Sequence, residues 1–168
     1  TILAGLQSRL MEPARFEQFA KLYVAESNRQ RMAQTAAKAG TQLWVENMSF
    51  AFLPGAEQLT AALDRYGNAD IGIVWDAPNS HFVDEDLAAS LRLCAKRLKL
   101  VHLSDTGRQL YRHDPVGAGT VPFNELPPVL AELGYTRPTM LEIISPNADR
   151  DILASAEKLA AMGLARAW

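Results

Sequence analysis

Four residues that can bind a metal ion stand where short apolar runs of the sequence end. We call them the strand-end cluster: Glu46, Asp76, His102 and Glu142. Three carboxylates and one imidazole offer mostly hard oxygen ligands, which suit Mn²⁺ or Mg²⁺ and are compatible with Co²⁺ or Zn²⁺. The cluster therefore predicts a site for one divalent metal ion.

Each member of the cluster also has an ordinary structural explanation. A carboxylate just after a strand is often a helix N-cap, and a lone histidine is more often structural than a ligand. Four such residues at equivalent positions are harder to explain in this way. Buried like charges need a cation or polar partners, so their repetition favours metal binding.

The elements that position the cluster follow a repeating pattern. Strands are predicted at residues 1–4, 42–45, 71–75, 100–103 and 139–143. Helices are predicted at 13–40, with a break near Ser27, at 56–66, at 84–96, before Gly134 and at 149–162, and a long loop at 104–123. Nearly all-apolar strands that alternate with helices indicate an α/β fold with a parallel sheet. Because the carboxyl ends of parallel strands meet at one rim, the cluster should come together there.

Length and composition narrow the class of protein. The chain has 168 residues, 48% of them hydrophobic, a net charge of −2 and one cysteine, Cys94. One domain spanning residues 1–168 is expected, and the charge disfavours a nucleic-acid partner. The sequence has no apolar run of about 20 residues and no signal-peptide pattern at its start, which predicts a cytoplasmic protein without a membrane anchor.

Several segments carry a family resemblance. Residues 43–47 (LWVEN), 73–76 (IVWD), 101–105 (VHLSD), 115–119 (PVGAG) and 140–143 (MLEI) resemble signatures of the xylose-isomerase-like TIM-barrel superfamily, which includes sugar phosphate isomerases and epimerases and family 2 AP endonucleases. The resemblance implies a (β/α)8 barrel, of which this chain would contain about strands 4 to 8.

The resemblance also implies roles for individual residues. The strand-end cluster takes the positions of the family's metal ligands, and Glu46 and Glu142 those of the catalytic glutamates that move the substrate proton. Arg108 matches a substrate-contacting arginine, and His113 lies in a segment that resembles a loop folding over the site. An ordinary surface turn is the alternative for His113.

Two departures from the family pattern affect the expected chemistry. Tyr111 stands where the endonucleases have an acidic ligand, and Asn79 where many members have histidine. Both changes disfavour a nuclease with three metal ions. His81 is a candidate replacement for the missing histidine as a substrate contact, against the alternative of an exposed loop residue.

The aromatic residues near the predicted rim have structural and functional interpretations. Trp44 and Trp75 should pack between the sheet and the helices. Phe50 and Phe52 follow Glu46 in a loop at the rim. They either wall the substrate pocket or form an ordinary contact between a loop and a helix.

The predicted function is a divalent-metal-dependent isomerase or epimerase acting on a sugar or a related polyhydroxy keto compound through an enediolate. The alternatives are a metal-dependent dehydratase of the dehydroshikimate or inosose type, and an inactive fragment or binding scaffold. A small sugar-like molecule is the expected partner. A partial barrel has uncovered edges, which predicts either a homodimer or an N-terminal barrel half that is missing from this chain.

Overall fold

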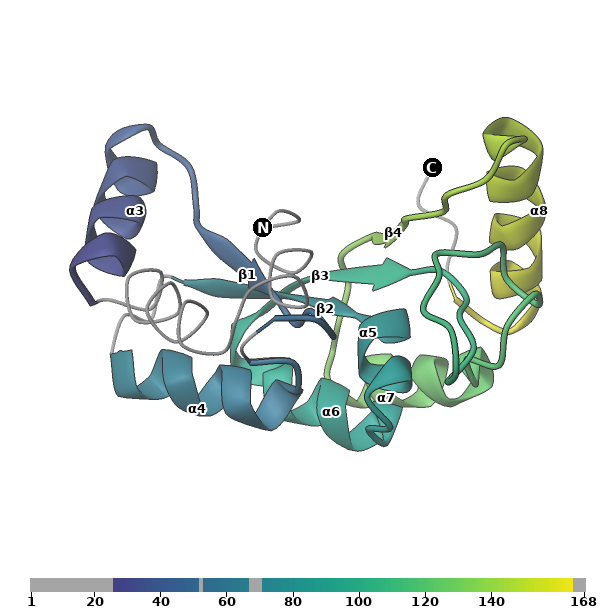
Figure 1. The fold of residues 1–168 in the computed structure, drawn as a ribbon, viewed down its shortest axis with the longest axis horizontal. Helices are drawn as coiled ribbons and strands as arrows, with labels where there is room; N and C mark the ends of the chain where they lie inside the picture. The colour runs from purple at the N-terminus through teal and green to yellow at the C-terminus, as the bar shows by residue number, and fades with distance from the viewer. Residues whose placement is uncertain (1–25, 52, 67–70, 165–168) are drawn as a thin grey trace.

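A sheet of four parallel strands forms the centre of the structure (Figure 1). The computed structural model describes residues 26–51, 53–66 and 71–164. The strands lie in chain order, and each pairs in parallel with the next. Their bounds are Trp44–Glu46 (β1), Gly72–Asp76 (β2), Leu98–Leu103 (β3) and Thr139–Leu141 (β4). This order, with helical connections, is the repeating arrangement of a β/α barrel.

Helices cover one face of this sheet. The α-helices are Glu26–Lys38 (α3), Ala56–Tyr66 (α4), Ala77–Phe82 (α5), Leu87–Cys94 (α6), Leu126–Glu132 (α7) and Ala148–Ala161 (α8). Short 3₁₀ turns occur at Ala95–Arg97 and Phe123–Glu125. In Figure 1, α4, α6 and α7 lie along the same side of the strands, while α3 and α8 stand at the two ends of the sheet. The chain thus forms an open section of a barrel, with its helices on the outside.

The hydrophobic core lies between the strands and these helices. Ile73, Trp75 and Val101 are each 0% exposed and belong to one cluster of buried apolar side chains. The indole Nε1 of Trp75 donates a hydrogen bond of 2.8 Å to Ser90 Oγ, so its polar atom is satisfied within the core. Trp75 therefore packs as predicted.

The prediction that Trp44 packs between the sheet and the helices is wrong. Trp44 is 38% exposed and Met140 is 44% exposed. Val45, next to Trp44 in the chain, packs against the core instead. Successive side chains of a strand point to opposite faces, so Val45 takes the helix-facing side of β1. Trp44 and Glu46 therefore share the inner face of the barrel section.

The predicted elements within the described residues are mostly confirmed. Helix α4 has the predicted bounds, and β2, β3 and β4 overlap the predicted strands. Gly134 has φ +62° just after α7, a conformation that glycine adopts readily. The predicted strand at 1–4 and the first part of the helix at 13–40 lie outside the described residues. Helix α3 is continuous from Glu26, where the described residues begin, so the predicted break near Ser27 stays a prediction.

The predicted helix at 84–96 is corrected. The helix here is α6, preceded by the separate short helix α5, which starts directly after β2. The carboxylate of Asp76 accepts a hydrogen bond from Asn79 N at 2.7 Å and so caps α5, with Pro78 in the first turn. These are common signals of a helix start. Among the described helices, none combines the length and apolar character needed to cross a bilayer.

Candidate metal centre

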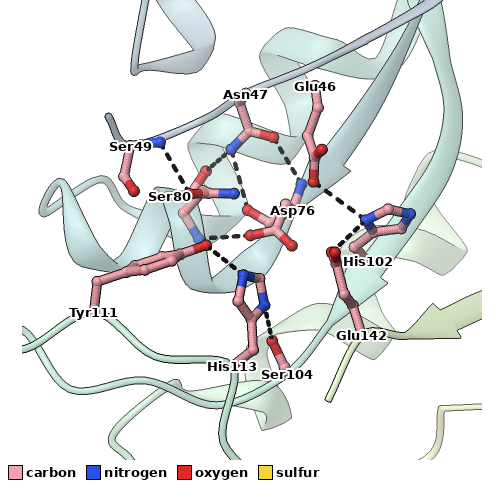
Figure 2. Close-up of polar contacts among 11 residues, drawn as sticks. Glu46, Asn47, Ser49, Asp76, Ser80, His102, Ser104, Tyr111, His113 and Glu142 are labelled. Atoms are coloured by element: carbon pink, nitrogen blue, oxygen red, sulfur yellow. Dashed lines mark hydrogen bonds and ion pairs between the residues drawn. The ribbon is translucent and has the colours of Figure 1, made fainter. Parts of the chain in front are cut away.

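The strand-end cluster comes together at the carboxyl ends of the four strands (Figure 2). Glu46 and Asp76 are the last residues of β1 and β2, His102 lies near the end of β3, and Glu142 directly follows β4. One ligand atom from each residue can be chosen so that all four lie within 4.8 Å of one another. The parallel sheet thus brings together side chains that are far apart in the sequence.

His102 links the two glutamates. Its Nδ1 lies 3.2 Å from Glu46 Oε1 and 3.0 Å from Glu142 Oε2. Burial alone would lower the pKa of His102, but the hydrogen bonds to Glu142 and Glu46 outweigh it and raise the pKa to about 9. The His102 hydrogen bond holds the pKa of Glu142 below its usual value, against the effect of burial. In the absence of a metal ion, a proton on His102 therefore offsets part of the negative charge.

Asp76 is the most buried carboxylate of the cluster, at 0% exposure. Burial, together with the charges of Glu46 and Glu142, raises the pKa of Asp76 well above its usual value. Its Oδ1 accepts the hydrogen bond from Asn79, while its Oδ2 and Nε2 of His102 are buried with no hydrogen-bond partner. Unpaired buried polar atoms beside further carboxylates are costly unless a cation compensates. The cluster thus fits one divalent cation, held by oxygen and imidazole ligands.

Asn47 fixes the backbones that carry two residues of the strand-end cluster. Its Oδ1 accepts from Asp76 N at 2.7 Å, and its Nδ2 donates to Asp76 O at 3.1 Å (Figure 2). Asn47 is 0% exposed and directly follows Glu46. One amide side chain therefore connects the end of β1 to the end of β2 at the cluster.

A buried polar chain continues from Asn47 into the core. Asn47 Nδ2 donates to Ser80 Oγ at 3.0 Å, and Ser80 Oγ lies 2.9 Å from Ser90 Oγ. Ser90 Oγ donates to Glu85 Oε2 at 2.9 Å, and Glu85 Oε1 accepts from Ala56 N, the first residue of α4, at 2.7 Å. The sequence interpretation missed this chain, because serines and amides carry no signal until their neighbours in space are known.

The loop 104–123 brings His113 and Tyr111 to the rim. His113 Nδ1 lies 2.9 Å from Ser104 Oγ, and its Nε2 lies 2.9 Å from the Tyr111 hydroxyl (Figure 2). His113 is close enough to Glu142 for its charge to lower the pKa of that carboxyl. The structure thus places His113 beside the strand-end cluster, and its role as a substrate contact stays a prediction.

Asp105 organises this loop from within. Its carboxylate accepts hydrogen bonds from Val121 N at 3.0 Å and from Gly117 N at 2.7 Å, and its backbone forms a bridge with Asp114. A Cβ at Gly119 would lie 2.4 Å from the carbonyl oxygen of Thr106, so the backbone approaches too closely for any other residue. Gly117 and Gly119 therefore serve the backbone path of the loop.

The side-chain contacts of His81 and Arg108 that the structure describes are with residues outside the strand-end cluster. His81 is 3% exposed, and its Nε2 lies 2.8 Å from Thr120 Oγ1, so it is not an exposed loop histidine. Arg108 is half-exposed and forms an ion pair with Asp84. For both residues, contact with a substrate stays a prediction.

Comparisons with known proteins agree with this fold. The profile of the family described as xylose isomerase-like TIM barrel matches residues 12–164. The chain belongs to this family. A search of curated proteins found no match.

Solved structures resemble the chain at low sequence identity. The apo 3-keto-D-glucoside 4-epimerase of E. coli has a TM-score of 0.68 and 20% identity, covering 81% of this chain and 52% of that protein. A D-tagatose 3-epimerase-like protein has a TM-score of 0.69 and 20% identity, covering 82% and 52%. The probable 3-DHS dehydratase AsbF of Bacillus anthracis, involved in petrobactin synthesis, has a TM-score of 0.71 and 16% identity, covering 86% and 57%. The chain thus spans about half the length of these structures, which share its fold.

Replacing Asn47 with alanine should weaken metal binding about ten- to a hundredfold, because two ligand-bearing strand ends lose their shared anchor. Titration calorimetry with Mn²⁺ measures the change. Asn124→Ala is the matched control, since Asn124 is exposed on a 3₁₀ turn, and it should bind as the wild type does. An Asn47→Ala protein that is folded by circular dichroism and binds Mn²⁺ with unchanged affinity would contradict this role.

The metal-free protein should lose stability as the pH rises from about 6.5 to 9. The pKa of His102 rises from 6.5 to about 9 on folding. Its contribution to the free energy of unfolding is therefore complete below pH 6.5 and is lost as the pH passes 9. The raised pKa of Asp76 acts in the same direction, from its unfolded value of 3.8 upward. Thermal unfolding in EDTA should show a falling Tm, and excess Mn²⁺ should reverse the trend because the cation competes with protons. His102→Asn should flatten the slope, and a metal-free Tm that rises over this range would refute the assignment.

Proposed function

We propose that this protein is a divalent-metal-dependent isomerase or epimerase of a sugar or related polyhydroxy keto compound, which acts by proton transfer through an enediolate. The observation that carries this proposal is the convergence of three carboxylates and one histidine at the strand ends. The metal ion, Mn²⁺ or Mg²⁺ in the first instance, would be held by the strand-end cluster. When bound, it would polarise the substrate carbonyl and stabilise negative charge on its oxygen.

Glu46 and Glu142 would perform the proton transfer. Glu46 ends the edge strand β1, and Glu142 follows the edge strand β4. Both carboxylates contact His102 Nδ1. One carboxylate would remove the proton from the carbon beside the carbonyl, leaving its electron pair in the enediolate. The other, protonated before the reaction, would give its proton to that carbon from the opposite face. Position rather than basicity would set the rate, since the His102 contact holds the pKa of Glu142 low.

The substrate would be held by residues around the cluster. His113, which already faces the rim through its contacts with Ser104 and Tyr111, would contact a substrate oxygen. Arg108 would anchor a hydroxyl or carboxylate after leaving Asp84, and His81 would act from beneath the loop 104–123.

We also propose that this protein is located in the cytoplasm and that residues 1–168 form one domain.

Exchange of substrate protons with D₂O tests the reaction. Mn²⁺-loaded protein should exchange the proton beside the carbonyl of D-fructose, D-tagatose or L-ribulose, as followed by NMR. Glu46→Gln and Glu142→Gln, each at saturating Mn²⁺, should slow this exchange about a hundredfold or more. Glu125→Gln, at an exposed position on the 3₁₀ turn before α7, should not slow it.

Different outcomes would redirect the assignment. If 3-dehydroshikimate loses water while the ketoses do not exchange, the protein is a dehydratase that uses the same residues. If no proton is exchanged and no water is lost with any of these compounds, the proposal fails and a binding scaffold is favoured.

We also propose that two copies of the chain complete the barrel. Within the described strands, β1 pairs only with β2 and β4 only with β3, and Trp44 and Met140 expose apolar surface on the inner face. Open strand edges and exposed apolar faces favour association. Light scattering should give twice the chain mass of 18.5 kDa. A monomer at micromolar concentration would contradict the dimer.

A further inference from the structure

Three aromatic side chains meet at the rim that carries the strand-end cluster. We call Phe50, Phe82 and Tyr111 the aromatic wall. The ring centroids of Phe50 and Tyr111 are 4.9 Å apart, those of Phe82 and Tyr111 are 5.3 Å apart, and those of Phe50 and Phe82 are 5.6 Å apart. The three residues come from the loop after β1, the end of α5 and the loop 104–123. The wall therefore joins three separate rim segments through mutual ring contacts.

Tyr111 connects this wall to the metal centre. Its ring makes an edge contact with His113 at 5.1 Å, and its hydroxyl lies 2.9 Å from His113 Nε2. Figure 2 shows the Tyr111 side chain beside Ser80 and Asp76. Burial, together with the charges of Asp76, Glu46 and Glu142, raises the pKa of Tyr111 above its usual value, which keeps its hydroxyl protonated. A molecule that reaches the strand-end cluster would therefore lie next to this ring.

The wall is not part of the hydrophobic core. Each of its three side chains is only partly buried, and none belongs to the core cluster beneath the sheet. Partly exposed aromatic rings beside a cluster of carboxylates give the rim one apolar side and one charged side. Sugars have the same two kinds of surface, because their hydroxyl groups leave patches of C–H bonds that pack against aromatic rings.

We propose that the aromatic wall determines substrate specificity by packing against the C–H face of a polyhydroxy ketone, while the oxygen atoms of the ketone face the strand-end cluster. This inference rests on the proposed function, since it assigns a substrate surface to the same site. The wall binds and orients the substrate but transfers no proton. Its loss affects KM more than kcat, and metal affinity stays the same.

The kinetic test compares variants of the wall with a neighbouring control. Phe82→Ala and Phe82→Leu, which keeps an apolar side chain but removes the ring, should raise KM for proton exchange in D-tagatose about three- to tenfold, with kcat within about twofold of wild type. Leu110→Ala, at a 59% exposed position next to Tyr111, should leave both constants unchanged. Mn²⁺ titration should give the wild-type affinity for every variant. An unchanged KM in folded Phe82→Leu, or an equal loss in the Leu110→Ala control, would overturn the inference.

A binding measurement separates this inference from the proposed reaction. In saturation-transfer NMR with D-tagatose, selective irradiation of the aromatic protons should transfer magnetisation to the C–H protons of the sugar. Phe82→Leu and Tyr111→Leu should reduce this transfer at least twofold, whether or not the protein catalyses exchange. If wild type and variants show the same transfer, or if wild type shows none, the wall does not contact the sugar. Transfer without proton exchange would reject the proposed reaction and leave the wall in place.

Discussion

Repulsion among the carboxylates of Glu46, Asp76 and Glu142 is the constraint on which the site depends. A parallel sheet delivers these groups to one rim, and Asp76 is fully buried there. Negative charges in such a place must be offset by protons or by a cation. The raised pKa values of His102 and Asp76 indicate that these two residues hold protons when no cation offsets the negative charge. Binding of a divalent ion at this cluster would thus exchange protons for the cation, with the same side chains holding both.

The surrounding structure holds this unfavourable arrangement in place. Asn47 pairs with the backbone of Asp76, and Asp76 in turn caps α5 through Asn79. Asp105 ties together the loop that presents His113 and Tyr111. These contacts are made by groups that the sheet and helices already fix. The fold alone therefore sets the positions of the strand-end cluster.

Much of the site could be predicted from the sequence because topology alone brings strand ends together. Residues that can bind metal recur after the apolar runs, as Asp76 does after residues 71–75. Recognising this repetition requires no knowledge of side-chain contacts. What lay beyond prediction depended on neighbours in space. Trp44 was expected to be buried, but only the face of β1 that carries Val45 meets the helices. No anchoring role was predicted for Asn47, because its partner on β2 is far away in the sequence.

The polar chain from Asn47 through Ser80, Ser90 and Glu85 to Ala56 has a consequence for the dynamics of the fold. Its hydrogen bonds run from the rim to the first turn of α4, and each polar group in it is paired with another group of the protein. Opening at one end would leave buried polar atoms unpaired along the whole line. The two adjacent β/α units should therefore open as a single cooperative unit, and amides at both ends should exchange with solvent at the same rate. Local fluctuations that loosen the metal site would then be as rare as the partial unfolding of that whole unit.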